Sequence, residues 1–302
     1  MLARFYTADV FTNRRFGGNQ LAVFPDASGI PESALPDIAR EFNLSETVFV
    51  YPPDDPRHTR RLRIFTPVTE LPFAGHPTVG TAFVLATLRA IPLDEPETRI
   101  VLEEGVGPVP VTVRVDKGVP TFCQLTVAKL PEFGPPPPGR SLLADVLGIE
   151  ATEISGGMYS PQAVSCGLRF LFVPVKDREV VRRARIRLDH WESTVKSYWA
   201  TDIMVFSRDP ERTGSDIRAR AFVPGQNIVE DPATGSAAAA LGGYLGSRES
   251  GADGAFRYVI EQGFEMGRPS ILEVAVEKAG NEITSVRVGG ESVMVTRGEM
   301  EI

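Results

Sequence analysis

The sequence contains few of the residues from which disulfide frameworks and metal centres are built. In 302 residues there are two cysteines and three histidines. Cys123 and Cys166 cannot form a disulfide framework, which favours a reducing compartment, and neither lies in a ligand-spaced cluster. The histidines are scattered at positions 58, 76 and 190. We therefore expect a cytoplasmic protein without a metal site.

Long apolar runs, excess positive charge and familiar catalytic motifs are also missing. No apolar stretch approaches the roughly 18 residues of a membrane span, and the net charge of −7 argues against nucleic acid as a partner. The one basic run, residues 182–187, is more typical of a solvated helix face than of a phosphate-binding patch. The sequence has neither a Gly-x-Ser-x-Gly elbow nor a full nucleotide-binding glycine loop, so we expect neither a serine hydrolase nor a nucleotide-binding site of that kind.

What the sequence does contain is a long internal repeat. Residues 63–85 are echoed by residues 220–245: each copy runs from Arg-x-Phe-x-Pro through a loop to a helix that opens on glycine, in Gly75-His76 and in Gly235-Ser236. A repeat of this length indicates two copies of one domain, because the periods of solenoids are far shorter. Two such domains facing each other would place two helix N-termini across one cleft.

The strongest linker signal is the proline-rich stretch at residues 131–139. Such a stretch is stiff and cannot join the interior of a sheet, so the domain boundary should fall at or just before it. We predict an N-terminal domain over residues 1–128 and a C-terminal domain over residues 129–285. A C-terminal strand, from about 286–302, is expected to return to the first domain.

Alternation and apolar periodicity predict short strands with helices between them. Strands are expected at residues 4–10, 20–24, 46–51, 60–65, 99–103, 109–115, 170–175, 202–207 and 217–222, and helices near residues 33–42, 77–88, 141–147, 177–184, 190–198 and 236–245. The helices at 77–88 and 236–245 carry apolar or small residues on every face, which indicates burial all round. Each half is therefore predicted to be a sheet wrapped around one central helix.

The starts of the two central helices are candidate anion sites. The first N–H groups of a helix are unpaired and carry the positive end of its dipole, which attracts a carboxylate or phosphate. One helix opens on Gly75-His76, and the other follows Asp231-Pro-Ala-Thr234-Gly-Ser236. For a single helix, the alternative that Asp231, Thr234 and Ser236 are simple caps is equally good. Two matched ends in a repeated domain favour binding of a small carboxylate.

Glu46 and His76 are candidate proton-transfer groups. Glu46 stands at the mouth of the apolar strand Thr47–Val50, where partial desolvation would raise its pKa and let it pass a proton both ways. On the strand pattern alone, a solvated strand-end glutamate is the commoner interpretation. His76 lies at a helix start, which favours the neutral imidazole. We therefore expect His76 to be a hydrogen-bonding or proton-relay group.

Six sequence motifs together carry a specific resemblance. They are Asp9-Val-Phe-Thr, Phe16-Gly-Gly-Asn, Ser45-Glu46-Thr-Val-Phe, Phe73-Ala-Gly75-His76-Pro-Thr, Glu230-Asp231-Pro-Ala-Thr-Gly235-Ser236-Ala and Glu261-Gln-Gly-Phe-Glu-Met-Gly-Arg268-Pro-Ser. On these motifs the chain resembles, over essentially its whole length, the PhzF family of phenazine biosynthesis-like proteins, relatives of diaminopimelate epimerase. The resemblance implies an α+β fold of the diaminopimelate epimerase-like kind. Such a fold has two pseudo-symmetric domains, each a mixed β-sheet curled around a central helix, with the active site between them. The resemblance also implies a homodimer.

The resemblance also implies an activity and a set of site residues. The activity is that of a cofactor-independent isomerase that shifts a proton within a small hydroxylated or unsaturated carboxylic acid. Glu46 would be the general acid and base, and His76 and Asp231 would complete the catalytic set by contacting polar groups of the substrate. Ser236, with the backbone amides near Gly75 and Gly235, would hold substrate oxygens.

The sequence departs from the pattern of these relatives in two ways. The epimerase and proline-racemase relatives use paired thiols, whereas Cys123 and Cys166 lie outside the motifs here, which argues against a two-thiol racemase. Gln20 stands where the PhzF family commonly has proline, which predicts altered local packing. Asp202, the counterpart of Glu46 in the repeat, is expected to be structural. The alternative to an isomerase is a non-catalytic protein that binds small carboxylates on the same scaffold.

Overall fold

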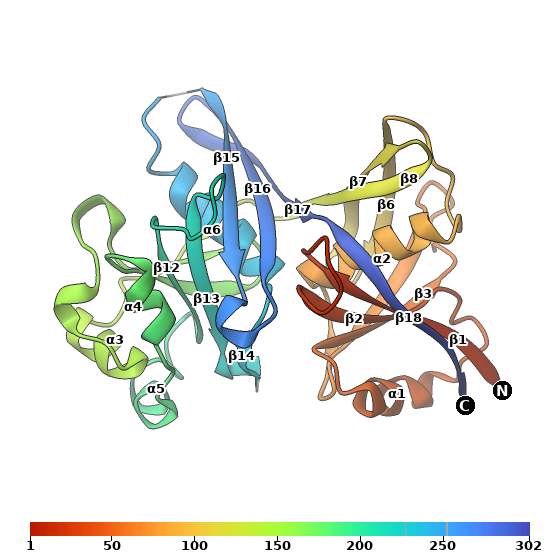
Figure 1. Cartoon of the computed structure of the whole chain (residues 1–302), viewed down its shortest axis with the longest axis horizontal. Helices are drawn as coiled ribbons and strands as arrows, with labels where there is room; N and C mark the ends of the chain where they lie inside the picture. The colour runs from red at the N-terminus through yellow and green to blue at the C-terminus, as the bar shows by residue number, and fades with distance from the viewer. Residues whose placement is uncertain (227, 252) are drawn as a thin grey trace. The chain divides into compact units, whose positions relative to one another are not determined.

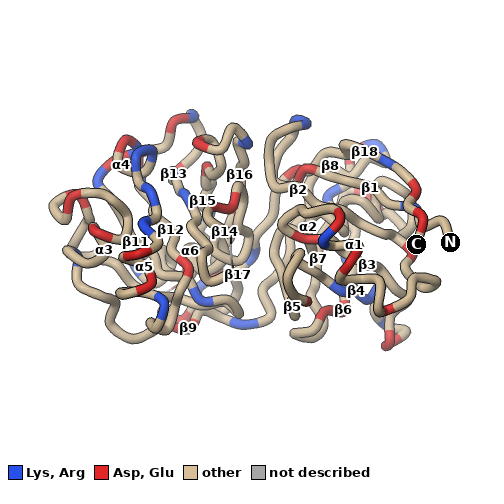
Figure 2. The backbone as a smooth tube through the Cα atoms, turned by 90° about the horizontal axis from the view of Figure 1, so that it is seen from below, with Lys and Arg blue, Asp and Glu red and all other residues tan. Residues whose placement is uncertain are grey.

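The computed structural model describes residues 1–226, 228–251 and 253–302, and the chain divides into two compact units (Figure 1). Unit 1 comprises residues 1–128 and 288–302, and unit 2 comprises residues 129–287. No helix among the described residues is long and apolar enough to cross a membrane. Acidic and basic residues are interspersed along the chain rather than separated (Figure 2).

Unit 1 is a mixed sheet. Its elements are β1 (Leu2–Val10), β2 (Asn19–Phe24), α1 (Leu35–Phe42), β3 (Glu46–Tyr51), β4 (Arg60–Phe65), β5 (Glu70–Leu71), α2 (Gly75–Thr87), β6 (Glu97–Glu104), β7 (Gly107–Asp116), β8 (Val119–Thr126) and β18 (Ser292–Glu301). Strand β1 pairs antiparallel with β18 and β2, β2 runs parallel to β3, and β3 pairs antiparallel with β4. Strand β4 continues the sheet in parallel to β6, followed by the antiparallel strands β7 and β8.

Helix α2 is the centre of unit 1. Every residue from Gly75 to Ala86 is buried, and the helix packs against β1, β2, β3, β7, β8 and β18. Helix α1 covers another part of the sheet, where Leu35, Ile38 and Ala39 join a core with phenylalanines of β2, β3 and β4. A helix without a polar face needs apolar partners on all sides, and the curled sheet supplies them.

Unit 2 has the same topology. Its elements are β9 (Glu132–Phe133), α3 (Arg140–Leu147), β10 (Gln162–Ser165), β11 (Arg169–Pro174), α4 (Arg178–Arg183), α5 (Leu188–Thr194), β12 (Asp202–Ser207), β13 (Ile217–Val223), β14 (Ile228–Asp231), α6 (Gly235–Gly246), β15 (Gly254–Gln262), β16 (Ser270–Ala279) and the first part of β17 (Glu282–Gly290). Strands β10 to β16 repeat the pairing directions of β1 to β7. Helix α6 packs against β10, β11, β15 and β16, as α2 packs in unit 1.

The structure refines several elements expected from the sequence. Helix α2 begins two residues earlier than expected, at Gly75, and α5 ends four residues earlier, at Thr194. Strand β8, over Val119–Thr126, was missed, because glycine and proline at its start hide the alternation. The basic run at 182–187 does not form one solvated helix face: α4 ends at Arg183, and Arg183 is ion-paired with buried Glu153.

Gly289 of β17 tests how closely the strands of unit 1 approach. A Cβ there would lie 2.8 Å from the Cα of Gln124 in β8 and would collide with the carbonyl oxygen of Cys123. We expect Gly289→Ala to lower the free energy of unfolding by about 1–3 kcal/mol, because the clash involves backbone that cannot rotate away. Gly29→Ala, which meets only the flexible end of Met1, is the control and should change stability by less than about 0.5 kcal/mol. Urea denaturation measures both, and equal stabilities would contradict the packing.

Candidate active site

The fold of unit 1 brings Glu46 and His76 together. Glu46 is the first residue of β3, and His76 is the second residue of α2. Nε2 of His76 lies 3.3 Å from Oε2 of Glu46, and only 5% and 11% of the two side chains are exposed. The interpretation of Glu46 as a solvated strand-end residue is therefore wrong, because α2 packs against β3 and covers it.

Asn19 holds the other side of the imidazole. Its Nδ2 lies 3.2 Å from Nδ1 of His76, and Asn19 is 1% exposed. The loop before it depends on Gly18, whose φ of +63° and whose contact with the Val10 carbonyl leave no room for a Cβ. The Asp9 carboxylate accepts a hydrogen bond from the Phe16 N–H at 2.7 Å. We had not singled out Asn19 from the sequence, although its place in the Gly-Gly-Asn motif was the signal for it.

The electrostatics of this pair follow from burial. Desolvation lowers the pKa of His76 to about 3, and a hydrogen bond to the Gln20 backbone acts in the opposite direction. The imidazole is therefore neutral at physiological pH, mainly because it is buried. The Asn19 contact selects one tautomer of the neutral ring. Asn19 Nδ2 can only donate, so Nδ1 accepts and Nε2 carries the ring proton, which faces Glu46 as a carboxylate.

The corresponding region of unit 2 brings Asp231, Thr234 and the start of α6 together. The Thr234 hydroxyl donates to Asp231 Oδ2 at 2.6 Å. Thr234 is the N-cap residue of α6 but makes no side-chain capping bond, so the simple-cap interpretation is wrong for it. The helix opens on buried Gly235, followed by half-buried Ser236. Ala74, the N-cap residue of α2, likewise makes no side-chain capping bond.

Gln262 and its neighbours clamp the turn that leads into α6. Gln262 Nε2 donates to the Asp231 carbonyl at 2.8 Å and to Thr234 Oγ1 at 2.9 Å, and its Oε1 accepts from the Thr234 N–H. The Ser270 hydroxyl donates to the Pro232 carbonyl at 2.9 Å. These contacts explain the Glu261-Gln-Gly-Phe-Glu-Met-Gly-Arg-Pro-Ser motif, to which the sequence reasoning assigned no local role.

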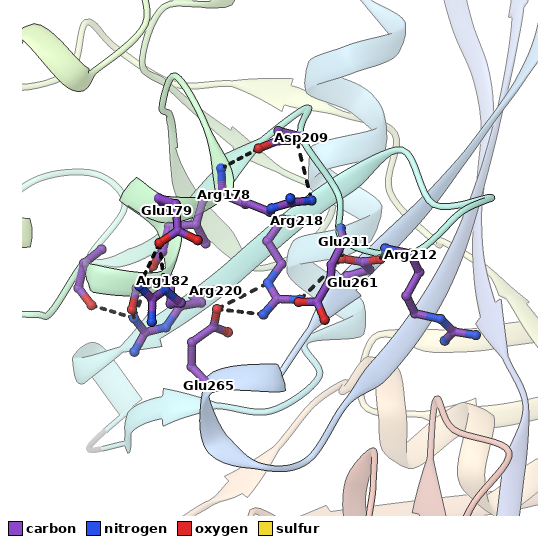
Figure 3. Close-up of polar contacts among 12 residues, drawn as sticks. Arg178, Glu179, Arg182, Asp209, Glu211, Arg212, Arg218, Arg220, Glu261 and Glu265 are labelled. Carbon is purple, nitrogen blue, oxygen red and sulfur yellow. Dashed lines mark hydrogen bonds and ion pairs between the residues drawn. The ribbon is translucent and has the colours of Figure 1, made fainter.

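Arg218 anchors the same motif from the sheet. Its guanidinium donates to Glu265 at 2.8 Å and to Glu261 at 3.3 Å (Figure 3). The guanidinium also lies over the ring of Phe264. Glu261 is fully buried and also accepts two backbone N–H groups, from Glu211 and Arg212. Ion pairs and hydrogen bonds therefore fix the segment from Glu261 to Ser270, and this segment in turn fixes the start of α6.

Asp202 has a structural environment, in agreement with the expectation for it. Its Oδ1 accepts from the Gly225 N–H and its Oδ2 from the Gln226 amide, both at 2.9 Å. Burial raises the pKa of Asp202 to about 6. Its two oxygens are thus committed to a turn, whereas its counterpart Glu46 faces an imidazole.

The remaining chemical features are two buried thiols and a charged cavity in unit 1. Cys123 and Cys166 are buried, which raises the pKa of both thiols, that of Cys166 to about 12. Among the described residues, no group of three or more His, Cys, Asp and Glu side chains is placed to hold a metal ion. A cavity of about 670 Å³ in unit 1 is lined by charged residues of β4 and β6, and neither Glu46 nor His76 contributes to it.

Known proteins resemble this chain over its full length. A family model, PhzC-PhzF, described as phenazine biosynthesis-like protein, matches residues 8–298. An uncharacterized isomerase of Mesorhizobium japonicum is 41% identical over 97% of both chains. The trans-2,3-dihydro-3-hydroxyanthranilate isomerase of Pseudomonas aeruginosa is 32% identical over 98% of both chains.

Solved structures share the fold. A PhzF-family phenazine biosynthesis protein of Bacillus anthracis has a TM-score of 0.87 at 24% identity and covers all of both chains. A hydroxyproline epimerase of Agrobacterium vitis has a TM-score of 0.59 at 14% identity and covers 99% of this chain and 92% of its own. The predicted fold class, an α+β fold of the diaminopimelate epimerase-like kind, is confirmed by these structures.

The buried thiols should resist alkylation. At pH 8 a pKa near 12 leaves a thiolate fraction ~10³-fold below that of an ordinary cysteine. We expect native protein treated with iodoacetamide to stay unlabelled in intact-mass spectra, while protein in denaturant takes up two labels. Labelling of the native protein at the rate of the denatured chain would show that a thiol is accessible.

The neutral state of His76 can be observed directly. Because burial lowers its pKa to about 3, its ring ¹⁵N chemical shifts should stay constant between pH 8 and pH 5. The His76 resonances are identified by their loss in His76→Asn. A titration midpoint between pH 6 and pH 7 would show that the ring is solvated.

Proposed function

Since the chain belongs to the PhzC-PhzF family of phenazine biosynthesis-like proteins, we propose that it shifts a proton within a small hydroxylated or unsaturated carboxylic acid, with Glu46 as general acid and base. The family match confirms the resemblance inferred from the motifs. The chain is an isomerase of the PhzF type, the class named in the relatives from Mesorhizobium and Pseudomonas. The carbon skeleton of its substrate and the residues that act on it belong to the proposal.

The contact between Glu46 and His76 is the observation that carries this proposal. The Glu46 carboxyl is buried against a neutral imidazole whose Nε2 faces it, which suits the carboxylate form that removes a proton. In the proposed reaction the Glu46 carboxylate removes a proton from one carbon. The electron pair of the broken C–H bond shifts the double bond along the carbon skeleton of the substrate, and Glu46 returns the proton to another carbon of that skeleton. Atoms and electrons balance without any further reactant.

We assign the remaining site residues to substrate binding and orientation. His76 and Asp231 contact polar groups of the substrate. The backbone amides at Gly75 and Gly235, with the Ser236 hydroxyl, bind its oxygens. The support is that the N-cap residues of α2 and α6 make no side-chain capping bonds, so the helix dipoles are available to an anion. Cytoplasmic location, a homodimer and the absence of a cofactor stay predictions.

Removal of the Glu46 carboxylate should abolish turnover. We expect Glu46→Gln to lower kcat by at least about 10³-fold, with thermal stability close to that of the parent, because the amide cannot accept the proton. Asp202→Asn is the matched control: it removes the repeat-related carboxylate, whose contacts are structural, and should keep kcat within about threefold. The assay is isomerisation of trans-2,3-dihydro-3-hydroxyanthranilate and a panel of small unsaturated carboxylic acids. Full activity of Glu46→Gln on any acid that the parent isomerises would refute the assignment.

Deuterium uptake distinguishes the isomerase from a protein that only binds carboxylates. In heavy water the product should acquire deuterium at one carbon, with partial retention of the original hydrogen if a single carboxyl carries it. A binding protein would leave every bound acid free of deuterium.

A further inference from the structure

Glu104 is a buried acid that the proposed reaction does not use. It ends β6 in unit 1 and lies beside the first turn of α2, the helix that carries His76. Its Oε1 is 2.6 Å from the hydroxyl oxygen of Thr78, and the same hydroxyl is 2.7 Å from the Ala74 carbonyl oxygen. Its Oε2 is buried with no hydrogen-bond partner among the described residues.

The two contacts of the Thr78 hydroxyl need two protons. A carbonyl oxygen can only accept, so the contact with Ala74 uses the single proton of the hydroxyl. The 2.6 Å contact with Glu104 can then be a hydrogen bond only if the carboxyl supplies its proton, whereas an ionised Glu104 would take the hydroxyl proton away from the Ala74 carbonyl. Two buried oxygens would then be in contact without a hydrogen between them, at the cost of a buried hydrogen bond.

Unit 2 has an uncharged side chain at the equivalent position. The strand ladders place Arg61 opposite Glu103 in unit 1 and Arg218 opposite Glu261 in unit 2, so the next residue, Glu104, corresponds to Gln262. The Gln262 amide donates to the Thr234 hydroxyl at 2.9 Å, beside the start of α6. A protonated Glu104 would likewise donate to a threonine hydroxyl, although Thr78 is the fourth residue of α2 whereas Thr234 is the N-cap residue of α6.

We propose that Glu104 holds a proton on Oε1 in the folded protein and is a positioning residue for the first turn of α2. Its consequence for catalysis rests on the proposed function. A neutral Glu104 leaves the positive end of the α2 dipole available to a substrate anion, whereas an ionised Glu104 would add a fixed negative charge there and draw the Thr78 hydroxyl proton away from the Ala74 carbonyl.

The surroundings of the carboxyl agree with this assignment. Burial raises the pKa of Glu104 to about 8, although hydrogen bonds from the Thr78 hydroxyl and the Ala74 N–H would favour the ionised form. The charged residues that line a cavity with Glu104 have partners of their own, such as Arg63, which lies 2.8 Å from Glu70. Glu103 accepts from the Asp54 N–H and contacts His58, and Arg61 lies 3.4 Å from Asp54 and over the Tyr51 ring.

The first test is the proton linkage of unfolding, which needs no substrate. A carboxyl protonated in the fold and ionised after unfolding binds more protons in the native state, so stability falls as pH rises. Ionisation of Glu104 should therefore raise the unfolding constant of the parent by about tenfold per pH unit between about pH 4.5 and pH 8. Above about pH 8 this contribution should level off.

The isosteric variant Glu104→Gln has the residue type that unit 2 has at Gln262. It should fold, and the pH dependence of its unfolding constant should be weaker than that of the parent by one proton. Glu97→Gln, which removes an exposed carboxylate of β6, should keep the parent slope. In infrared spectra in D₂O at pH 6 the protonated-carboxyl band should be larger in the parent than in Glu104→Gln, because Asp202, with a pKa of about 6, contributes to the band of both proteins. An unchanged slope, an unchanged band, or a Gln variant that cannot fold overturns the proposal.

The second test is the pH profile of the Michaelis constant. The substrate is a carboxylate that the parent isomerises. The KM of the parent for it should rise above about pH 8 by up to tenfold per pH unit, while the KM of Glu104→Gln stays constant. The two proteins should share the same kcat at pH 7. Identical KM profiles would overturn the positioning role, and absence of any turnover would count against the proposed function and leave the linkage result standing.

Discussion

The complete burial of α2 and α6 is the constraint on which each unit depends. Neither helix has a polar face, so strands must pack against it from many sides, and the sheet curls to supply them. Close packing explains glycines that would otherwise cost about 1 kcal/mol each in a helix. A Cβ on Gly80 would lie 2.5 Å from a methyl group of Val10, and one on Gly243 would lie 2.6 Å from Pro131.

Burial also determines the environment of the polar side chains at the helix starts. A buried helix carries its unpaired N–H groups and dipole into a region of low dielectric, and the polar side chains of each unit gather at that end. In unit 1 these are Glu46, His76 and Glu104, and in unit 2 they are Asp231, Thr234 and Gln262. The same neighbours that exclude water keep His76 neutral and favour the protonated form of Glu104.

The two units share a skeleton and differ in titratable groups. At matching ladder positions Glu104 stands where unit 2 has Gln262, and Glu46 stands where unit 2 has Asp202. Asp202 is tied to a turn by two hydrogen bonds, whereas Glu46 faces an imidazole. The duplicated fold thus has two buried glutamates and an imidazole near the start of α2 in unit 1, and hydroxyl, amide and carboxylate groups at the start of α6 in unit 2.

The sequence alone determined the repeat, the two apolar helices and the motifs that identify the family. Strands such as Glu46–Tyr51 and Asp202–Ser207 were predicted to the residue, because a local pattern of apolar residues sets them. Only the tertiary structure decided that Glu46 is buried, that Asn19 meets His76, and that Glu104 and Gln262 occupy equivalent places. The reason is physical: a hydrogen bond depends on strand register, and desolvation depends on neighbours contributed by strands and helices far apart in the chain.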